Sequence, residues 1–296
     1  MEKVYILLDI GGTQIKGGLA DENGNMIEEI TSIDAHAKDS KDIILNNMAT
    51  FIQQLKQKRE GAEVMGIGMA FPGPFDYENG ICLLDGLDKY ESIYGVSIEK
   101  EMKSRINNID NVKFYFLHDI ESFAIGESWM GEAKEDNKIL CLCIGTGTGT
   151  AFVGDKMILK EAKNGVPLNG WLYETPYKES KIDDYLSVRG LARISKAVIG
   201  TELDGKSLYD LCKENDKKAL DVYRRFGQDL VACILPFVDA FHPDAIVFGG
   251  QISKSFEYFG NDFRLECEKR NIKIYKEYET SIRAMQGLYI KMKQGD

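Results

Sequence analysis

The feature that most constrains this chain is a short apolar strand that ends in an acid and two glycines. The strand is expected over Val4–Leu8, and Asp9 and the pair Gly11-Gly12 follow it. Glycine adopts backbone angles closed to other residues, so the chain can turn tightly here and present amide hydrogens. Just beyond the turn, Thr13 adds a hydroxyl and Lys16 a positive charge. A carboxylate beside exposed amides suits a polyphosphate and its magnesium ion, so this stretch predicts phosphate binding, with Asp9 nearest the metal.

The same stretch excludes one phosphate-binding pattern and leaves a simpler alternative open. No Gly-x-x-x-x-Gly-Lys-Ser/Thr sequence occurs, and apolar alternation resumes through Ile15, Gly17 and Leu19. The turn is therefore expected to join two antiparallel strands rather than a strand and a helix. The alternative is a plain hairpin with Gly-Gly at its turn, which would need neither the acid nor the lysine.

Composition narrows the classes of partner. The formal charge is −10, from 37 basic and 47 acidic residues among 296, which argues against nucleic acid or an anionic membrane as the main partner. The six cysteines lack the spacing of a metal knuckle or a disulfide framework, and no secretory signal or long apolar run occurs. We expect a cytoplasmic protein with reduced thiols.

The order of predicted elements repeats halfway along the chain. In the first half an apolar strand, a glycine turn and two further strands, the third near Met26–Ile33, precede alternating helices and strands. At Ile139 the order begins again with a buried strand to Ile144, and Gly145-Thr146-Gly147 forms a second glycine turn. This is a repeat of architecture rather than of close sequence.

The repeat predicts an α/β protein of two similar domains, residues 1–118 and 119–280, with the final helix, 281–296, packing back on the first. Each domain would supply one Gly/Thr turn, so amides from both can reach the phosphates of one nucleotide. A third glycine cluster, Gly249-Gly250, would let a base or ribose lie against the backbone. A continuous helix is expected near Ser255–Arg270.

Taken in order, these motifs resemble the ROK family of sugar kinases and sugar-sensing repressors, within the actin-like ATPase superfamily. The resemblance spans nearly the whole chain and rests on Asp9-Ile-Gly-Gly-Thr13-x-x-Lys16, Gly66-x-Gly68-x-x-x-Pro72-Gly73, the Asp119 helix with Gly126-Glu127, Gly145-Thr-Gly-Thr-Gly149, and Pro243-Asp-x-Ile246-Val-x-Gly249-Gly250. It implies an actin-like (ribonuclease H-like) fold around an interdomain cleft, ATP and magnesium, a sugar in that cleft, phosphoryl transfer to a sugar hydroxyl, and a homodimer.

The resemblance also implies residue roles. Nucleotide and phosphate contacts are expected from Asp9, Gly11, Gly12, Thr13, Lys16, Gly145, Thr146, Gly147, Gly249 and Gly250. Sugar contacts are expected from Gly73, His118, Asp119, Glu174 and Asp183.

Asp119 is the expected catalytic base. It lies between a strand end and a helix start, where a carboxylate can point into a cleft, and phosphoryl transfer needs one acceptor for the hydroxyl proton. The alternative is that Asp119 only caps the helix that begins at Ile120. The family carries Asn where this chain has His118, so a different sugar preference and simple tolerance at this position both remain open.

Two further departures lie near the expected sugar pocket. Most family kinases have Glu-x-Gly-His followed by closely spaced cysteines that bind zinc, whereas this chain has Glu174-Thr-Pro-Tyr177. Residues 144–211 contain no cysteine and no histidine, so the family's structural zinc site is expected to be absent. Asp183 replaces a sugar-binding Glu and is one methylene shorter, which suggests a wider pocket or a different sugar.

Three functions compete. The first is an ATP-dependent kinase for a hexose, with a glucose-like acceptor as the default. The second is a sugar-responsive regulator, but family repressors carry a helix-turn-helix ahead of this core and only eight residues precede Asp9. The third is a catalytically impaired sugar-binding homologue, although the retained Asp9, Lys16 and Asp119 favour chemistry.

Overall fold

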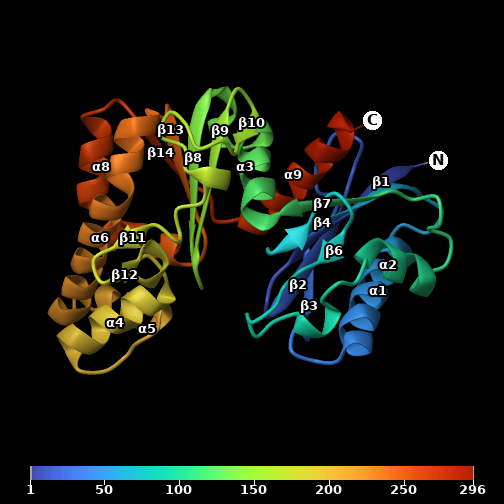
Figure 1. The fold of residues 1–296 in the computed structure, drawn as a ribbon, viewed down its shortest axis with the longest axis horizontal. Helices are drawn as coiled ribbons and strands as arrows, with labels where there is room; N and C mark the ends of the chain where they lie inside the picture. Colours follow the sequence, from blue (N-terminus) through green and yellow to red (C-terminus); the bar gives the residue numbers. More distant parts are fainter. Residues whose placement is uncertain (1, 296) are drawn as a thin grey trace. The chain divides into compact units, whose positions relative to one another are not determined.

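The computed structural model describes residues 2–295, which form two compact units (Figure 1). One unit holds residues 2–130 together with 281–295, and the other holds 131–280. The boundary thus follows Met130 rather than His118, because the helix α3 (Asp119–Met130) belongs to the first unit.

The first unit is built on a five-stranded mixed sheet in the order β3-β2-β1-β4-β7. The strands are β1 (Lys3–Ile10), β2 (Gln14–Ala20), β3 (Thr31–Asp34), β4 (Glu63–Phe71) and β7 (Phe114–His118). As the glycine turn predicts, β1 and β2 pair antiparallel, whereas β1, β4 and β7 run parallel. The helices of this unit are α1 (Lys41–Gln57), α2 (Ile98–Arg105), α3 and α9 (Thr280–Gln294), and a short hairpin is formed by β5 (Phe75–Asp76) and β6 (Ile81–Cys82).

Two glycines bring α3 and α9 into close contact. A Cβ on Gly126 would lie 1.9 Å from the carbonyl oxygen of Arg283, and one on Gly287 would lie 1.8 Å from that of Ser122. The Ser122 hydroxyl also donates to the carbonyl of Ala284 at 2.6 Å. Backbone therefore packs directly on backbone, which explains why α3 groups with α9 in the first unit.

The second unit repeats the sheet of the first. Its order is β10-β9-β8-β13-β14, so in both sheets the third, second, first, fourth and fifth strands lie side by side. The strands are β8 (Lys138–Ile144), β9 (Thr148–Gly154), β10 (Met157–Leu159), β13 (Ala245–Gly249) and β14 (Lys273–Lys276). The helices are α4 (Val188–Ile199), α5 (Gly205–Lys213), α6 (Lys217–Phe241), α7 (Phe256–Phe259) and α8 (Asn261–Glu268). The predicted internal repeat is confirmed.

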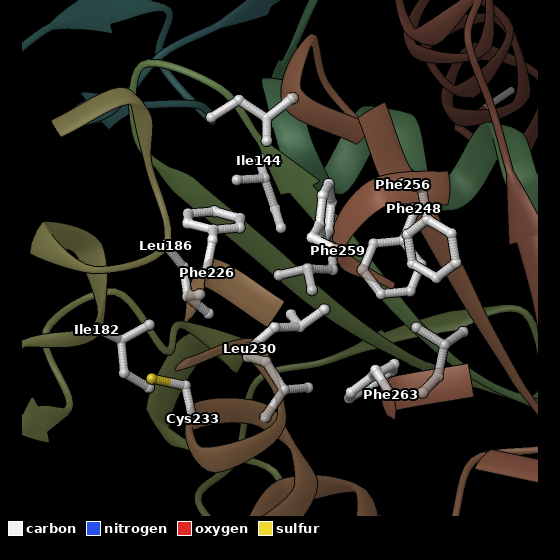
Figure 2. Close-up of a cluster of buried hydrophobic side chains, with 14 of the residues drawn as sticks. Ile144, Ile182, Leu186, Phe226, Leu230, Cys233, Phe248, Phe256, Phe259 and Phe263 are labelled. Atoms are coloured by element: carbon white, nitrogen blue, oxygen red, sulfur yellow. The ribbon is translucent and has the colours of Figure 1, made fainter. Parts of the chain in front are cut away.

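The core of the second unit gathers on α6. Phe226 and Leu230 belong to one buried cluster with Ile144 of β8, Phe248 of β13 and Phe259 of α7 (Figure 2). Ile182 and Leu186 enter the same cluster from the segment that precedes α4. That segment is thereby fixed against the core although it has little regular structure.

Three local expectations differ from the structure. The helix predicted over 255–270 is divided into α7 and α8 at Gly260, where a Cβ would lie 2.4 Å from the ring of Phe256. The third strand covers only 31–34; Met26 forms an isolated bridge with Ala20, and the side chains of Met26 and Ile30 lie over Gly18. The irregular stretch 161–182 contains the hairpin of β11 (Pro176–Tyr177) and β12 (Ser180–Lys181).

Within residues 2–295, no helix combines the length and apolarity needed to cross a membrane.

Candidate functional site

In the first unit, the predicted acids gather at one edge of the sheet. The parallel strands β1, β4 and β7 end together, since Asp9 pairs with Ala70 and Phe71 pairs with His118. Asp119 directly follows β7, and Gly73 lies two residues beyond the end of β4. The carboxyl ends of parallel strands are where α/β proteins bind ligands, so this edge is the candidate site of the first unit.

The first glycine turn is fixed by hydrogen bonds at Gly11, whereas its next two residues are exposed to solvent. The amide of Gly11 donates to the carbonyl of Gln14 at 2.9 Å, and the hydroxyl of Tyr90 donates to the carbonyl of Gly11 at 2.7 Å. Gly12 and Thr13 are exposed. The turn is therefore fixed by protein contacts while its outer residues face solvent, as a phosphate-binding turn requires.

Asp9 lies beside a cation and a helix start. Burial raises its pKa, and the charge of Asp119 acts in the same direction, whereas a hydrogen bond from Ser281 and the charge of Lys16 favour the ionised form. The Lys16 ammonium donates to the hydroxyl of Ser281 at 3.1 Å. Ser281, in the first turn of α9, was not predicted here, because from sequence it is typical of a helix start and lies far along the chain.

Asp119 is both a helix-start residue and a close neighbour of the His118 imidazole. Its Oδ1 accepts from the amide of Ile120 at 2.7 Å and lies 2.9 Å from Nδ1 of His118. Burial works against ionisation, but His118, the Ile120 amide and the charge of Lys89 outweigh it, so the pKa of Asp119 lies below its usual range. Asp119 is therefore ionised at neutral pH and able to accept a proton.

Lys89 is a site residue that sequence reasoning missed. A Cβ placed on Gly12 would lie 3.4 Å from Cδ of Lys89, so the lysine side chain passes over the first glycine turn. Its charge also contributes to the lowered pKa of Asp119. Lys89 lies in a loop rich in Asp and Gly without periodicity, where a lysine is usually solvated, so no pattern indicated it.

In the second unit, the other two glycine clusters meet. β8 and β13 are parallel neighbours, and Gly249 pairs with Cys143. Gly250 has a φ of +85°, and a Cβ there would lie 2.4 Å from the carbonyl oxygen of Ile144, directly before the turn that begins at Gly145. Thr146 is exposed at the tip of that turn. Only glycine fits at position 250, and the two clusters form one continuous backbone surface.

The two predicted sugar-binding acids of the second unit differ in setting. Glu174 is exposed, in the segment before β11. Asp183 instead lies against the second glycine turn, where its Oδ1 accepts from the amide of Thr148 at 2.7 Å and its Oδ2 contacts Arg189.

Tyr177, which stands at the family's histidine position, binds a buried acid. Its hydroxyl donates to Oδ1 of Asp229 on α6 at 2.8 Å, and the ammonium of Lys178 contacts the same oxygen. Burial and this hydrogen bond raise the pKa of Tyr177 to about 12. Throughout residues 2–295, no group of three or more His, Cys, Asp and Glu side chains is arranged to hold a metal ion.

Comparison with known proteins connects this arrangement to one family. The model of the ROK family matches residues 5–287. The chain is 23% identical to a glucokinase of Thermotoga maritima, covering 87% of this chain and 85% of that protein. It is 26% identical to an N-acetyl-D-glucosamine kinase of Aliivibrio salmonicida, covering 84% and 85%. A ROK family glucokinase of Streptomyces griseus, crystallised with glucose and AMPPNP, shares the fold with a TM-score of 0.74 at 17% identity, covering 99% of this chain and 100% of that one.

Proposed function

The chain belongs to the ROK family, and we propose that within it this protein is an ATP-dependent kinase that transfers the γ-phosphoryl group to a hydroxyl of a hexose, with a glucose-like acceptor as the default. The relatives named above phosphorylate glucose or N-acetyl-D-glucosamine by their names, which supports a hexose but leaves the particular sugar a proposal.

One observation carries this proposal. An ionised carboxylate, Asp119, lies at the same sheet edge as a glycine turn that is flanked by Lys16 and overlaid by Lys89. A protein that only binds sugar has no use for a proton acceptor next to a phosphate-binding turn. Phosphoryl transfer needs that acceptor, and it needs positive charge to stabilise the phosphates.

The roles follow from the chemistry. Asp119 accepts the proton of the sugar hydroxyl while that oxygen attacks the γ-phosphorus and ADP leaves. Gly11 and Gly145 close the two turns, because their amides donate to the carbonyls of Gln14 and Gly147. The amides of Gly12 and Thr13 would hold phosphate oxygens on one unit, and those of Thr146 and Gly147 would offer the same on the other, with Gly249 and Gly250 against the nucleoside. Gly73, His118 and Glu174 contact the sugar.

Asp9 would hold the magnesium ion through the phosphates. A partly buried carboxylate whose burial raises its pKa gains from a nearby cation, and oxygen ligands are those that Mg²⁺ prefers. When bound, Mg²⁺ would neutralise charge on the triphosphate. We also propose a homodimer, from the family likeness alone, which sedimentation can test.

The test is an ADP-release assay with MgATP over a panel of sugars: glucose, N-acetylglucosamine, N-acetylmannosamine, fructose, allose and a β-glucoside. We expect ADP release that depends on one or a few hexoses and disappears without magnesium. Lack of sugar-dependent release from folded protein across the panel would contradict the kinase reading.

The contact between His118 and Asp119 supports a second candidate function, a sugar-binding homologue with impaired catalysis. The His118 imidazole lies 2.9 Å from the Asp119 carboxylate and helps to lower the pKa of Asp119, which weakens this residue as a proton acceptor. A sugar-binding homologue with impaired catalysis would bind a sugar of the panel by calorimetry yet release no ADP. The chain's acidic charge makes a DNA-binding regulator a poorer fit.

A further inference from the structure

The predicted sugar ligand Asp183 forms a clamp on the second glycine turn together with Arg189. One carboxylate oxygen of Asp183 accepts from the Thr148 amide at 2.7 Å, and the other contacts the Arg189 guanidinium. Nη1 of Arg189 also donates to the carbonyl of Thr146 at 3.1 Å. Both side chains of this pair are therefore bound to the turn itself.

The segment that carries the pair has little freedom to move away. The amide of Val188 donates to the carbonyl of Gly145 at 2.9 Å, and the buried Thr148 hydroxyl donates to the carbonyl of Leu186. Ile182 and Leu186, on either side of Asp183 in the chain, are buried in the core of the unit (Figure 2). The carboxylate is thus held at the turn by its neighbours as well as by its own hydrogen bonds.

The two members of the pair differ in exposure. The side chain of Asp183 is only 17% exposed, and its Oδ1 would lie 3.0 Å from a Cβ on Gly147, in direct contact with the turn. The side chain of Arg189 is 52% exposed, so its guanidinium faces solvent next to Thr146, although its Nε also lies 3.5 Å from Oδ1 of Asp184. A guanidinium has five N–H donors, so one that these contacts orient keeps N–H groups and positive charge for a phosphate oxygen.

We propose that Asp183 is a positioning residue for the second glycine turn and that Arg189 contacts the phosphates of the nucleotide bound there. This inference rests on the proposed function, because that function supplies the triphosphate. It assigns Asp183 to the nucleotide side of the reaction rather than to the sugar, and it adds Arg189 to the site.

Titration of the whole chain with magnesium and AMPPNP, alongside the KM of a sugar from the panel, tests the proposal. We expect Arg189→Ala to weaken AMPPNP binding roughly 10–100-fold, since a charged hydrogen bond is lost. Arg189→Lys should restore part of the affinity, because it keeps the charge without the fork. Asp183→Ala and Asp183→Asn should weaken AMPPNP binding while the sugar KM changes less than about threefold.

Two variants serve as matched comparisons. Glu174→Ala should raise the sugar KM and leave AMPPNP affinity unchanged, the reverse of the Asp183 variants. Lys196→Ala removes a charge from an exposed position on the same helix, α4, and should change neither quantity. If Asp183→Ala does not fold, as judged by thermal melting, the Asn variant and the Arg189 variants decide.

The results of these titrations distinguish a failure of the roles proposed for Asp183 and Arg189 from a failure of the proposed kinase function. If the unmodified chain does not bind AMPPNP with magnesium, the proposed function and this inference both fail. If it binds and the variants bind equally well, only this inference fails. If Asp183→Asn raises the sugar KM and spares nucleotide affinity, Asp183 is a sugar contact and the clamp is refuted.

Discussion

At the scale of single residues, one substitution separates two roles of Asp119. Asp119→Asn keeps the side chain's size and an oxygen that can accept from the amide of Ile120, but it cannot take up a proton. If Asp119 is the base, turnover should fall by roughly 10²–10⁴ with melting temperature and nucleotide affinity nearly unchanged. Because its pKa is lowered, turnover should also stay flat from pH 8 down to about 5 as far as this group is concerned.

The measurement is kcat on the best sugar of the panel for the parent and the variant. If Asp119 only begins α3, Asn serves nearly as well and activity survives. Near-parental turnover of the variant would falsify the catalytic assignment, and Glu174 would then be the next carboxylate to test.

The raised pKa of Asp9 predicts that function and stability conflict at this position. The folded state holds the proton of Asp9 more tightly than the unfolded chain, so the free energy of unfolding falls as pH rises from the ordinary carboxyl range, about 4, through the raised pKa. Asp9→Asn removes this penalty. We expect the variant to melt at a higher temperature than the parent at pH 8, with the difference shrinking toward pH 4, and to lose most activity.

Thermal melts at both pH values check this, with Glu60→Gln as the control for loss of an exposed carboxylate. A variant less stable than the parent at pH 8 would mean that the contacts of Asp9 with Ser281 and Lys16 outweigh the burial of its charge.

At the scale of elements, apolar runs and glycines predicted the strands and turns of the site. They did not predict the features that depend on side-chain contacts. Buried parallel strands such as β8 and β13 are continuous apolar runs and stand out in any sequence. The division between α7 and α8 does not, since apolar spacing continues across Gly260. The clamp of Asp183 on its turn was equally hidden, because no pattern in one sequence specifies which of two nearby groups a carboxylate will bind.

The crossing of α3 and α9 gives a prediction about stability. Gly126→Ala places a methyl group 1.9 Å from the Arg283 carbonyl oxygen, which the helices can accommodate only by moving apart. We expect a loss of about 1–3 kcal/mol or more, seen as a clear drop in melting temperature. The control is Gly205→Ala in α5, where the nearest atom to the added methyl is 3.9 Å away and little change or a slight gain is expected. Equal melting temperatures for parent and Gly126→Ala would show that the helices separate without cost.

At the scale of the whole molecule, the duplicated architecture could be predicted because each half repeats one order of strands and glycine turns. The boundary between the units could not, because it depends on a contact between α3 and α9, which lie far apart in the sequence. The sequence indicated most residues of the two turns. It did not indicate Lys89 or Ser281, because these residues reach the first turn from distant segments of the chain.

The β11–β12 hairpin of the second unit is fixed to α6 by polar side chains. The family resemblance implies a zinc site in this region for most family kinases, whereas here the hydroxyl of Tyr177 and the ammonium of Lys178 bind the buried carboxylate of Asp229 on α6. We expect purified, untagged protein to contain no stoichiometric zinc by elemental analysis and to melt at the same temperature with and without excess EDTA. Tyr177→Phe should lower stability by about 1–3 kcal/mol, because a buried carboxylate loses a donor. Bound zinc at one per chain, or a fall in melting temperature on chelation, would show that a metal rather than this polar cluster fixes the hairpin.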